Sequence, residues 1–521
     1  MPVARSLPPS LTLPRKGGGD KFTLIFLVAV LALSACAPAA REPGGGTGQQ
    51  PTQPVKKRLV AAALGDVFTV SSYLATGSTG TNQPGISEVE KLVNVGLGTR
   101  IGGRIEARLA EAIPTTDNGL WKVFPDGTME TTWKIRPNVF WHDGRPFTTE
   151  DLLFTAQASQ DREIDFTRST LFASVERIEV PDPTTLVVKW KSPYIDADRL
   201  FASSGTMPMP KHLLEEPYLA NRAALPQLSY WNRDFVGTGP YRLREWVPSS
   251  HLIVEANDAY VLGRPKIDEI EVRSIPNPNT SVANVLSGAV EVTLGRGLSI
   301  DQALAFRDQW RDGRIELSDS GNPTMLGPQF LNPSPPIVAD VRFRRALYQA
   351  LDRQEMANAL QGGLVEVAHS GLPFGDPSYD EVQRSVVRYA FDPRRAVQMI
   401  EELGYVRAAD GMFRDATGQS LPVQVASSTT DLYIRTALAS ADYWKRVGID
   451  AEPYTVPDAR ERDFEFRANY PAFEVVSSGS GIDSLNNMWL FYNGHAMAIG
   501  NRLVNVTALA DTANGHDWDV R

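Results

Sequence analysis

Residues 133–151, which read WKIRPNVFWHDGRPFTTED, constrain the fold more than any other stretch of the chain. Before the proline, large and polar side chains alternate, which is the pattern of a half-buried strand. Asp143-Gly144 offers a turn whose second residue tolerates a positive φ. Thr148 or Thr149 can cap a following helix that has carboxylates in its first turn. The sequence therefore predicts a strand, an aromatic loop, a tight turn and a capped helix in direct succession.

Composition narrows the class of protein without naming a function. At 521 residues the chain is too long for one core, so two or three lobes are expected. The net charge of −9 leaves no basic excess to displace counterions from nucleic acid or anionic lipid. No His-Glu-x-x-His, Gly-x-Ser-x-Gly, Walker or paired-cysteine motif occurs, so neither an enzyme nor a cofactor is predicted. An exported hydrolase is a rival hypothesis, but the sequence offers no recognisable nucleophile with a base beside it.

The histidines give no reason to expect a bound metal. All six are scattered, and no two have the spacing of metal ligands on a helix. His142 is predicted to hydrogen-bond within its own loop rather than to bind a metal or exchange a proton, because a lone histidine is rarely a site without a partner.

The N-terminal region predicts export and lipid anchoring. Residues 22–33 are apolar in all but one position and too short to span a bilayer, which takes roughly 20 residues, so they are typical of a signal peptide. The following LSAC resembles a lipobox, so residues 1–36 are predicted to be a lipoprotein signal peptide with Cys36 as the lipidated residue. The alternative is a stray cysteine behind an uncleaved signal. Residues 37–57, rich in Gly, Pro and Gln, are predicted to be a flexible linker.

Three motifs together resemble one protein family. The Trp-His-Asp-Gly loop at 141–144 precedes a Thr-x-x-Asp helix start, residues 236–243 read VGTGPYRL, and residues 340–353 form an amphipathic helix behind an aspartate cap. This set is similar to the large dipeptide-, oligopeptide- and nickel-binding family of extracellular solute-binding proteins of ABC importers. The resemblance implies an α/β fold of the type II periplasmic-binding-protein form, with two lobes joined by a hinge and an additional small domain.

The family pattern also implies domain boundaries in this sequence. It places lobe I at residues 58–98 and 228–312, domain II at 99–227 and lobe III at 313–521. Family members continue with a helical segment and a final pass back into the first domain. Residues 501–521 lack that pattern, so the C-terminal part is expected to be truncated and to leave apolar surface of the first lobe uncovered.

Residues 477–489 (SSGSGIDSLNNMW) are the predicted ligand-binding segment. In peptide-binding relatives a glycine followed four residues later by an aspartate lies in the cleft, where the carboxylate pairs with the peptide's α-ammonium group and the glycine segment with its backbone. Gly479 and Asp483 have that spacing, with Ser480 and Gly481 between them. A buried carboxylate needs a cationic partner, which the ligand would supply. The alternative is an aspartate in an exposed loop or at a helix N-cap.

Other candidate ligand contacts come from weaker signals. Gly77, Ser78 and Asn82 lie in a polar loop after the first predicted strand, which either presents backbone NH groups and hydroxyls to a ligand or is an ordinary solvated loop. Trp489 can form the floor of a side-chain pocket or pack inside the third domain. Asn332 can lie near the hinge, whereas the proline beside it favours a structural turn.

The resemblance implies a monomeric, lipid-anchored binding component of an ABC importer, in the periplasm or at the cell surface. It would capture peptides between two lobes and deliver them to a membrane permease with its ATPase subunits. Closure of the lobes must be driven by ligand contacts to both of them. The same motifs would also fit a binder of an oligosaccharide, an opine or a metal chelate, which would differ only in the lining of the cleft.

Overall fold

The computed structural model describes residues 56–74, 85–101, 104–203, 205–295, 297–372, 378–460, 463–477, 484–508 and 510–521, with the backbone alone at residues 318–321, 458 and 464. The predicted signal peptide with Cys36, and all but the last two residues of the predicted linker, lie outside these residues. Lipid anchoring therefore stays a prediction. Within the described ranges, no helix is both long and apolar enough to cross a membrane.

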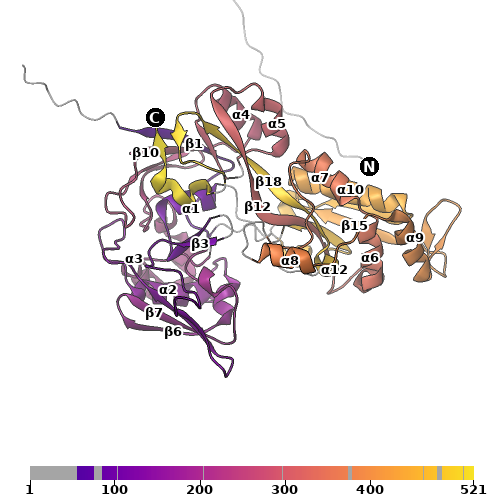
Figure 1. Cartoon of the computed structure of the whole chain (residues 1–521), viewed down its shortest axis with the longest axis horizontal. Helices are drawn as coiled ribbons and strands as arrows, with labels where there is room; N and C mark the ends of the chain where they lie inside the picture. Colours follow the sequence, from indigo (N-terminus) through magenta and orange to yellow (C-terminus); the bar gives the residue numbers. More distant parts are fainter. Residues whose placement is uncertain are drawn as a thin grey trace, which may run out of the picture. The chain divides into compact units, whose positions relative to one another are not determined.

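A ten-stranded mixed sheet is the largest element of the structure (Figure 1). Its order is β16-β15-β17-β12-β18-β11-β1-β10-β9-β8. The strands are β1 (Arg58–Ala63), β8 (Tyr241–Val247), β9 (His251–Ala256), β10 (Glu269–Ser274), β11 (Val292–Leu294), β12 (Gly313–Pro328), β15 (Pro422–Ser427), β16 (Asp450–Thr455), β17 (Phe473–Ser477) and β18 (Trp489–Gly500). β1 runs parallel to β10 and β11, and β15 runs parallel to β16 and β17. The long antiparallel pair β12 and β18 joins these two parallel groups into one sheet.

A second, four-stranded antiparallel sheet has the order β4-β5-β7-β6. Its strands are β4 (Trp121–Val123), β5 (Met129–Lys134), β6 (Val175–Asp182) and β7 (Thr185–Trp190). Short pairs are β2 (Gly98–Ile101) with β3 (Arg104–Ala107), β13 (Val406–Arg407) with β14 (Phe413–Arg414), and β19 (Leu503–Val504) with β20 (Asp519–Val520). The α-helices are α1 (Ile86–Val93), α2 (Thr149–Gln160), α3 (Lys211–Ala220), α4 (Pro278–Leu286), α5 (Ile300–Arg307), α6 (Val341–Gln349), α7 (Arg353–Gln361), α8 (Tyr379–Ser385), α9 (Pro393–Glu402), α10 (Asp431–Arg446), α11 (Phe464–Ala468) and α12 (Ser484–Asn487).

Residues 133–151 form the strand, turn and helix start that their pattern predicts. β5 is half-buried in strict alternation, Gly144 adopts a φ of 84°, and α2 begins directly after its N-cap, Thr148. The Asp151 carboxylate accepts hydrogen bonds from the backbone N–H groups of Thr148 and Lys211, both at 2.9 Å. The aspartate therefore caps its own helix and also fixes the start of α3. The prediction for this stretch is confirmed.

His142 connects this loop to the Gly-Thr-Gly-Pro bend, two motifs that lie almost one hundred residues apart. Its Nδ1 accepts a hydrogen bond from the Gly237 N–H at 3.2 Å, and its Nε2 lies 3.0 Å from the Gly239 carbonyl oxygen. These partners require a neutral imidazole with the proton on Nε2. Burial lowers the pKa of His142 to about 4, which favours the same neutral form. The predicted structural role is confirmed, but the partners lie in the bend and not in the histidine's own loop.

The two glycines of the bend are there because the backbone of α1 passes directly beside them. A Cβ atom on Gly237 would lie 2.1 Å from the Val93 carbonyl oxygen, and one on Gly239 would lie 2.4 Å from the Val93 carbonyl carbon. Thr238 between them donates a hydrogen bond to the Val95 carbonyl oxygen at 2.6 Å. Only glycine permits this approach, so the bend docks onto the end of α1.

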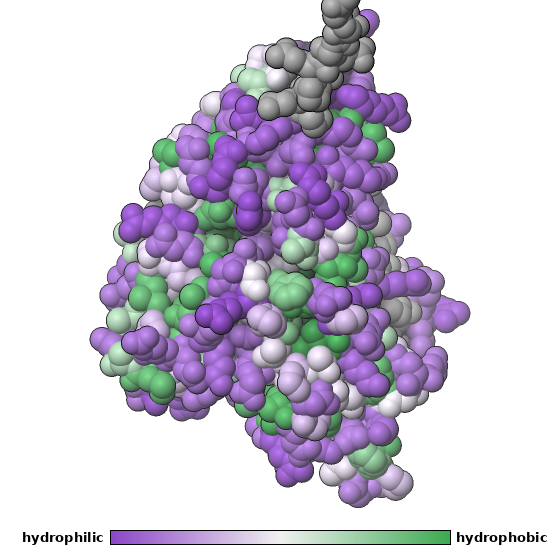
Figure 2. All heavy atoms as spheres, turned by 90° about the vertical axis from the view of Figure 1, so that its left-hand side faces the viewer, coloured by the Kyte–Doolittle hydropathy of each residue, from purple (hydrophilic) through white to green (hydrophobic). Residues whose placement is uncertain are grey.

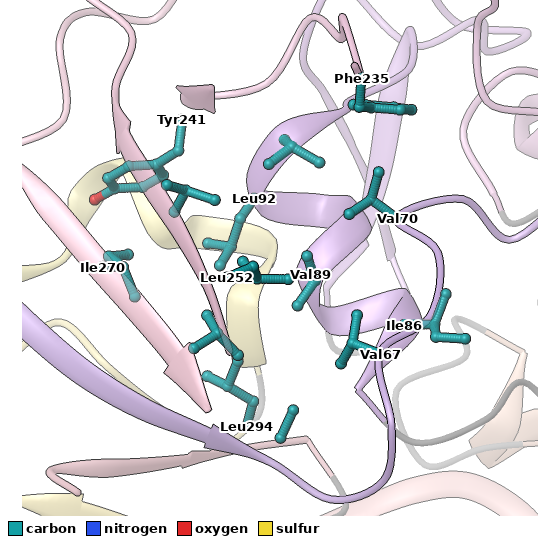
Figure 3. Packing of buried hydrophobic residues seen from close by; sticks show 14 of the residues in the cluster. Val67, Val70, Ile86, Val89, Leu92, Phe235, Tyr241, Leu252, Ile270 and Leu294 are labelled. Carbon is teal, nitrogen blue, oxygen red and sulfur yellow. The ribbon is translucent and has the colours of Figure 1, made fainter. Parts of the chain in front are cut away.

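Buried side chains collect in several hydrophobic cores. In one of them, Figure 3 shows Val89 and Leu92 of α1 packed beside Leu252 of β9 and Ile270 of β10. A second core lies among α6, α9, α10 and the strands β15 to β17. A third surrounds Trp133 between the four-stranded sheet and α2. Burying each large apolar side chain contributes roughly 1.5–3 kcal/mol, so each core can hold its own group of elements together.

The C-terminal segment runs back into the core that contains α1. β18 pairs with β12 and also with β11, and its Met497 and Ile499 belong to that core. Trp518, just before β20, is fully buried in the same core. Residues of β18 and of the tail thus contribute to the core that contains α1, while the truncation and the assignment of residues 313–521 to lobe III stay predictions. The other domain boundaries stay predictions.

Polar contacts fasten this tail at its end. Lys57 Nζ lies 2.5 Å from Asp519 Oδ1, and the Tyr241 hydroxyl donates to the Gly515 carbonyl oxygen at 3.2 Å. The side of the molecule on the left of Figure 1 is hydrophilic over most of its area, with hydrophobic patches between (Figure 2). The Lys57–Asp519 ion pair, the Tyr241 hydrogen bond and the buried Trp518 hold the tail against the first core.

We expect His142→Ala to destabilise the fold in a pH-dependent way. The folded-state pKa of about 4 lies below the usual 6.5, so the wild type loses stability as the pH falls from about 6.5 to about 4, by up to roughly 3 kcal/mol. The variant lacks this loss, so its stability deficit, which is the difference in free energy of unfolding from the wild type, should shrink as the pH falls over that range. Urea unfolding of both proteins at pH 7.5 and pH 4.5 measures the deficit. A deficit that is the same at both pH values would contradict the assigned neutral role.

Candidate functional site

The predicted ligand contacts follow the carboxyl ends of the two parallel strand groups. In open α/β sheets, ligands bind beyond the carboxyl ends of the strands. β1 leads into the loop with Gly77, Ser78 and Asn82, and β17 leads into the segment of Gly479, Ser480, Gly481 and Asp483. All seven residues lie outside the described part of the chain.

A network of polar side chains fixes both ends of the segment 478–483. At its start, the Ser477 hydroxyl oxygen accepts a hydrogen bond from Asn493 Nδ2 at 2.8 Å, and Asn493 Oδ1 accepts one from the Thr324 hydroxyl. At its end, the Ser484 hydroxyl donates to the His369 carbonyl oxygen at 3.0 Å. These contacts tie β17, β12 and β18 together. The residues on either side of the segment, Ser477 and Ser484, are therefore each held by a hydrogen bond.

Trp489 lies beside this network and is wholly buried. It packs with Ala368 and Tyr492, and its carbonyl oxygen accepts hydrogen bonds from the Tyr348 hydroxyl at 2.5 Å and from Arg353 at 3.2 Å. Its indole Nε1–H is buried without an acceptor among the described residues. Of the two interpretations left open by the sequence, this arrangement corresponds to packing inside the third domain.

Asn332 lies in an exposed bend after β12. The bend is held by its neighbours, since the Ser334 N–H donates to the Pro471 carbonyl oxygen at 2.7 Å and the Leu331 N–H to Gln329 Oε1 at 2.8 Å. This arrangement corresponds to a structural turn. A role for Asn332 near the hinge stays a prediction.

Sequence reasoning missed a buried carboxylate that anchors the other loop. Glu90 of α1 is only 1% exposed, and its Oε1 accepts hydrogen bonds from the Ser72 N–H at 2.9 Å and the Ser72 hydroxyl at 3.1 Å. The Ser72 oxygen in turn accepts the Gly205 N–H at 3.1 Å. Burial raises the pKa of Glu90 to about 7. No sequence signal separates Glu90 from an exposed helical glutamate such as Glu216 of α3, because burial depends on which loop covers it.

A second carboxylate, that of the half-buried Asp511, comes from the C-terminal tail. Its Oδ1 accepts the Gly295 N–H at 2.9 Å, directly after β11, and its Oδ2 lies 3.9 Å from Lys91 Nζ. Burial raises the pKa of Asp511 to about 6, against the opposing effect of the lysine charge. Carboxylates therefore hold both the loop after β1 and the loop after β11. In the described ranges, no group of three or more His, Cys, Asp or Glu side chains is placed to hold a metal ion.

Comparison with known proteins decides the family. Residues 107–498 match the family model described as bacterial extracellular solute-binding proteins, family 5 Middle. The chain belongs to this family. Family 5 membership makes it a solute-binding protein rather than an enzyme.

Relatives and solved structures agree with this assignment. A Brucella ovis protein named as an ABC transporter peptide-binding protein is 26% identical over 343 residues, which are 64% of this chain and 59% of the relative. The chain thus spans about three-fifths of the length of that relative. AppA of Bacillus subtilis, solved with a nonapeptide, has a TM-score of 0.67 at 18% identity, covering 89% of this chain and 99% of AppA. NikZ of Campylobacter jejuni, solved with Ni(L-His), has a TM-score of 0.69 at 17% identity over the same shares. The fold is therefore that of the type II periplasmic binding proteins, as predicted.

Replacing the buried Glu90 should change how stability depends on pH. Below about pH 4.5 the protonated Glu90 carboxyl contributes up to roughly 3 kcal/mol to the stability of the wild type. This contribution is lost as the pH rises through about 7. Glu90→Gln keeps an acceptor for Ser72 but does not ionise, so its stability relative to the wild type should increase from pH 5 to pH 8. Urea unfolding at both pH values measures this difference. Glu216→Gln, at an exposed position of α3, is the control and should change stability by less than about 0.5 kcal/mol. Parallel pH profiles of the wild type and Glu90→Gln would contradict the assignment.

Proposed function

We propose that the protein is the peptide-binding component of an ABC importer, exported and anchored by a lipid on Cys36. The family match over residues 107–498 carries the proposal, and a relative named as peptide-binding and a neighbour solved with a nonapeptide support the choice of peptides. The ligand is bound without chemical change and passed to a membrane permease, whose ATPase drives transport. The protein acts as a monomer at the cell surface or in the periplasm.

Peptide recognition rests on the segment that follows β17. The Asp483 carboxylate pairs with the α-ammonium group of the peptide, and the backbone of Gly479 to Gly481 pairs with the peptide backbone. The hydrogen bonds of the flanking Ser477 and Ser484 support the proposal, because a segment whose ends are held has less conformational freedom to lose on binding. Gly77, Ser78 and Asn82 contribute contacts from the loop after β1, which Glu90 anchors through Ser72.

Closure over the ligand takes place at the long strands β12 and β18. Their pairing is irregular at one point, since the register advances four residues from Asp319 to Pro323 on β12 but two from Gly494 to Tyr492 on β18. Such a bulge bends a strand and interrupts its ladder. The bulge lies where β12 and β18 connect the two parallel groups, so a small rotation there changes the distance between the two loops that contact the ligand.

Loss of the Asp483 carboxylate should weaken the binding of peptides with a free N-terminus. We expect Asp483→Asn to reduce affinity at least tenfold for a free tripeptide, because a charge-assisted contact to the ammonium group is lost. Asp117→Asn, in an exposed loop, is the matched control and should bind like the wild type. Isothermal titration against a free and an N-acetylated tripeptide measures both effects. Equal affinity of the wild type and Asp483→Asn for the free peptide would refute the ammonium contact but not the family.

Native purification followed by mass spectrometry identifies the ligand class itself. Intact peptides recovered with the wild-type protein would support the proposal. An intact metal–amino-acid complex would favour the second candidate, a chelate binder, for which the neighbour solved with Ni(L-His) is the supporting observation. Recovery of cleaved or modified products would contradict both.

A further inference from the structure

An ion pair joins a helix of one half of the large sheet to a helix of the other half. The first half is the group of β1, β10 and β11, and the second half is the group of β15, β16 and β17. Asp301, in the first turn of α5, has its Oδ2 2.9 Å from Arg435 Nη1 of α10. α5 packs on the first half through Ala303, and α10 packs on the second half through Ala437 and Ala441. The pair therefore connects the two halves through side chains, in addition to the backbone pairing of β12 with β18.

The helices of the two halves also meet over the bulge in β18. A Cβ atom on Gly494 would lie 2.5 Å from Ile300 Cδ1 of α5 and 2.8 Å from Cγ1 of Val365, which follows α7. The Gly494 N–H donates to Gln361 Oε1 of α7 at 3.3 Å. α5 and α7 therefore lie on the same face of β18, where its register with β12 is irregular. α10 packs beside α7, so the three helices follow one another along this face (Figure 1).

α1 covers the opposite face of the first half. On β18, Ala496 and Ala498 enter the core beneath α5, whereas Met497 and Ile499 enter the core that contains α1. Phe154 of α2 belongs to the core of α1 as well. The predicted domain II, which includes α2, is therefore attached to the first half on the α1 side.

The second half is hollowed on the face opposite α10. On β15, Val423 and Val425 enter the core beneath α10, whereas Gln424 and Ala426 line a cavity of about 650 Å³. Because α5, α7 and α10 share one face of the sheet, this hollow and domain II lie on the other. A rotation at β12 and β18 that brings the hollow toward domain II closes that face and moves α5 away from α10.

We propose that the ion pair of Asp301 with Arg435 is a latch that holds the two halves open and thereby lowers the affinity for the ligand. This inference rests on the proposed function, in which the halves close over a peptide. Closure breaks the pair, so the ligand has to overcome its contribution. The side chains are 49% and 34% exposed, and such pairs are weak, so loss of the latch should raise affinity only about two- to fourfold.

Spin labels on the two halves test the latch without any ligand. Glu216→Cys in α3 and Glu401→Cys in α9, both at exposed positions, each carry one label in a full chain whose native Cys36 is replaced by alanine. Double electron–electron resonance then measures the distribution of distances between them. Asp301→Asn should raise the population of the shorter distance about two- to fourfold. The same distribution in the wild type and in Asp301→Asn would overturn the proposal.

A double-mutant cycle tests the effect on affinity, with tri-L-alanine as the probe in isothermal calorimetry. Asp301→Asn and Arg435→Gln should each tighten binding about two- to fourfold, and the double variant no further, because either change alone breaks the pair. Asp431→Asn is the matched control, since it removes the other carboxylate, 2.9 Å from Arg435 Nε, and leaves the latch intact. It should bind like the wild type.

Gains that add up in the double variant, or an equal gain in Asp431→Asn, would overturn the latch. Absence of tri-L-alanine binding in the wild type and in every variant would instead contradict the proposed peptide function. The distance distributions of the ligand-free proteins would then still decide whether Asp301 and Arg435 hold the halves apart.

Discussion

The pairing of β12 with β18 is the interaction on which the rest of the structure depends. β12 leads away from the parallel group that contains β1, and β18, near the C-terminal end of the chain, runs back to that group. The middle of the sheet is therefore formed by segments almost two hundred residues apart. Nearly every residue of β18 is buried, and its side chains enter cores on both halves of the sheet. Without this pair, the two parallel groups would have no hydrogen-bonded connection in the described part of the sheet.

Polar side chains that are partly or fully buried fix the positions of loops rather than those of the cores. His142 holds the aromatic loop to the glycine bend, and Asp151 holds the start of α3. Glu90 and Asp511 do the same for the loops after β1 and β11, and the pKa of each is raised because the carboxylate is taken out of water. Such hydrogen-bonded groups define the position at which a loop leaves a strand, since an apolar contact is not directional.

How far the sequence could predict the fold is clearest at particular residues. The turn at Gly144 and the cap at Thr148 follow from local chemistry, because backbone angles and the first N–H groups of a helix are decided within a few residues. Trp489 was assigned two alternatives because an aromatic residue after a glycine-rich segment is compatible with either a pocket or a core. Glu90 and Asp511 were missed since nothing near them in the sequence indicates the loop that buries each one. The return of β18 was missed for the same reason, as a strand's partners are determined by distant segments.

The sequence by itself determined the family, the α/β class and the local elements around residues 133–151 and 236–243, because these rest on short-range patterns of side-chain size, capping and backbone freedom. The single cysteine also excludes a disulfide framework, and the acidic composition excludes a general affinity for nucleic acid. Only the tertiary structure decided which polar side chains are buried, where the last residues pack, and that Asp301 of α5 meets Arg435 of α10. Burial is a property of the whole arrangement, since a side chain loses its water only when elements from elsewhere in the chain close over it.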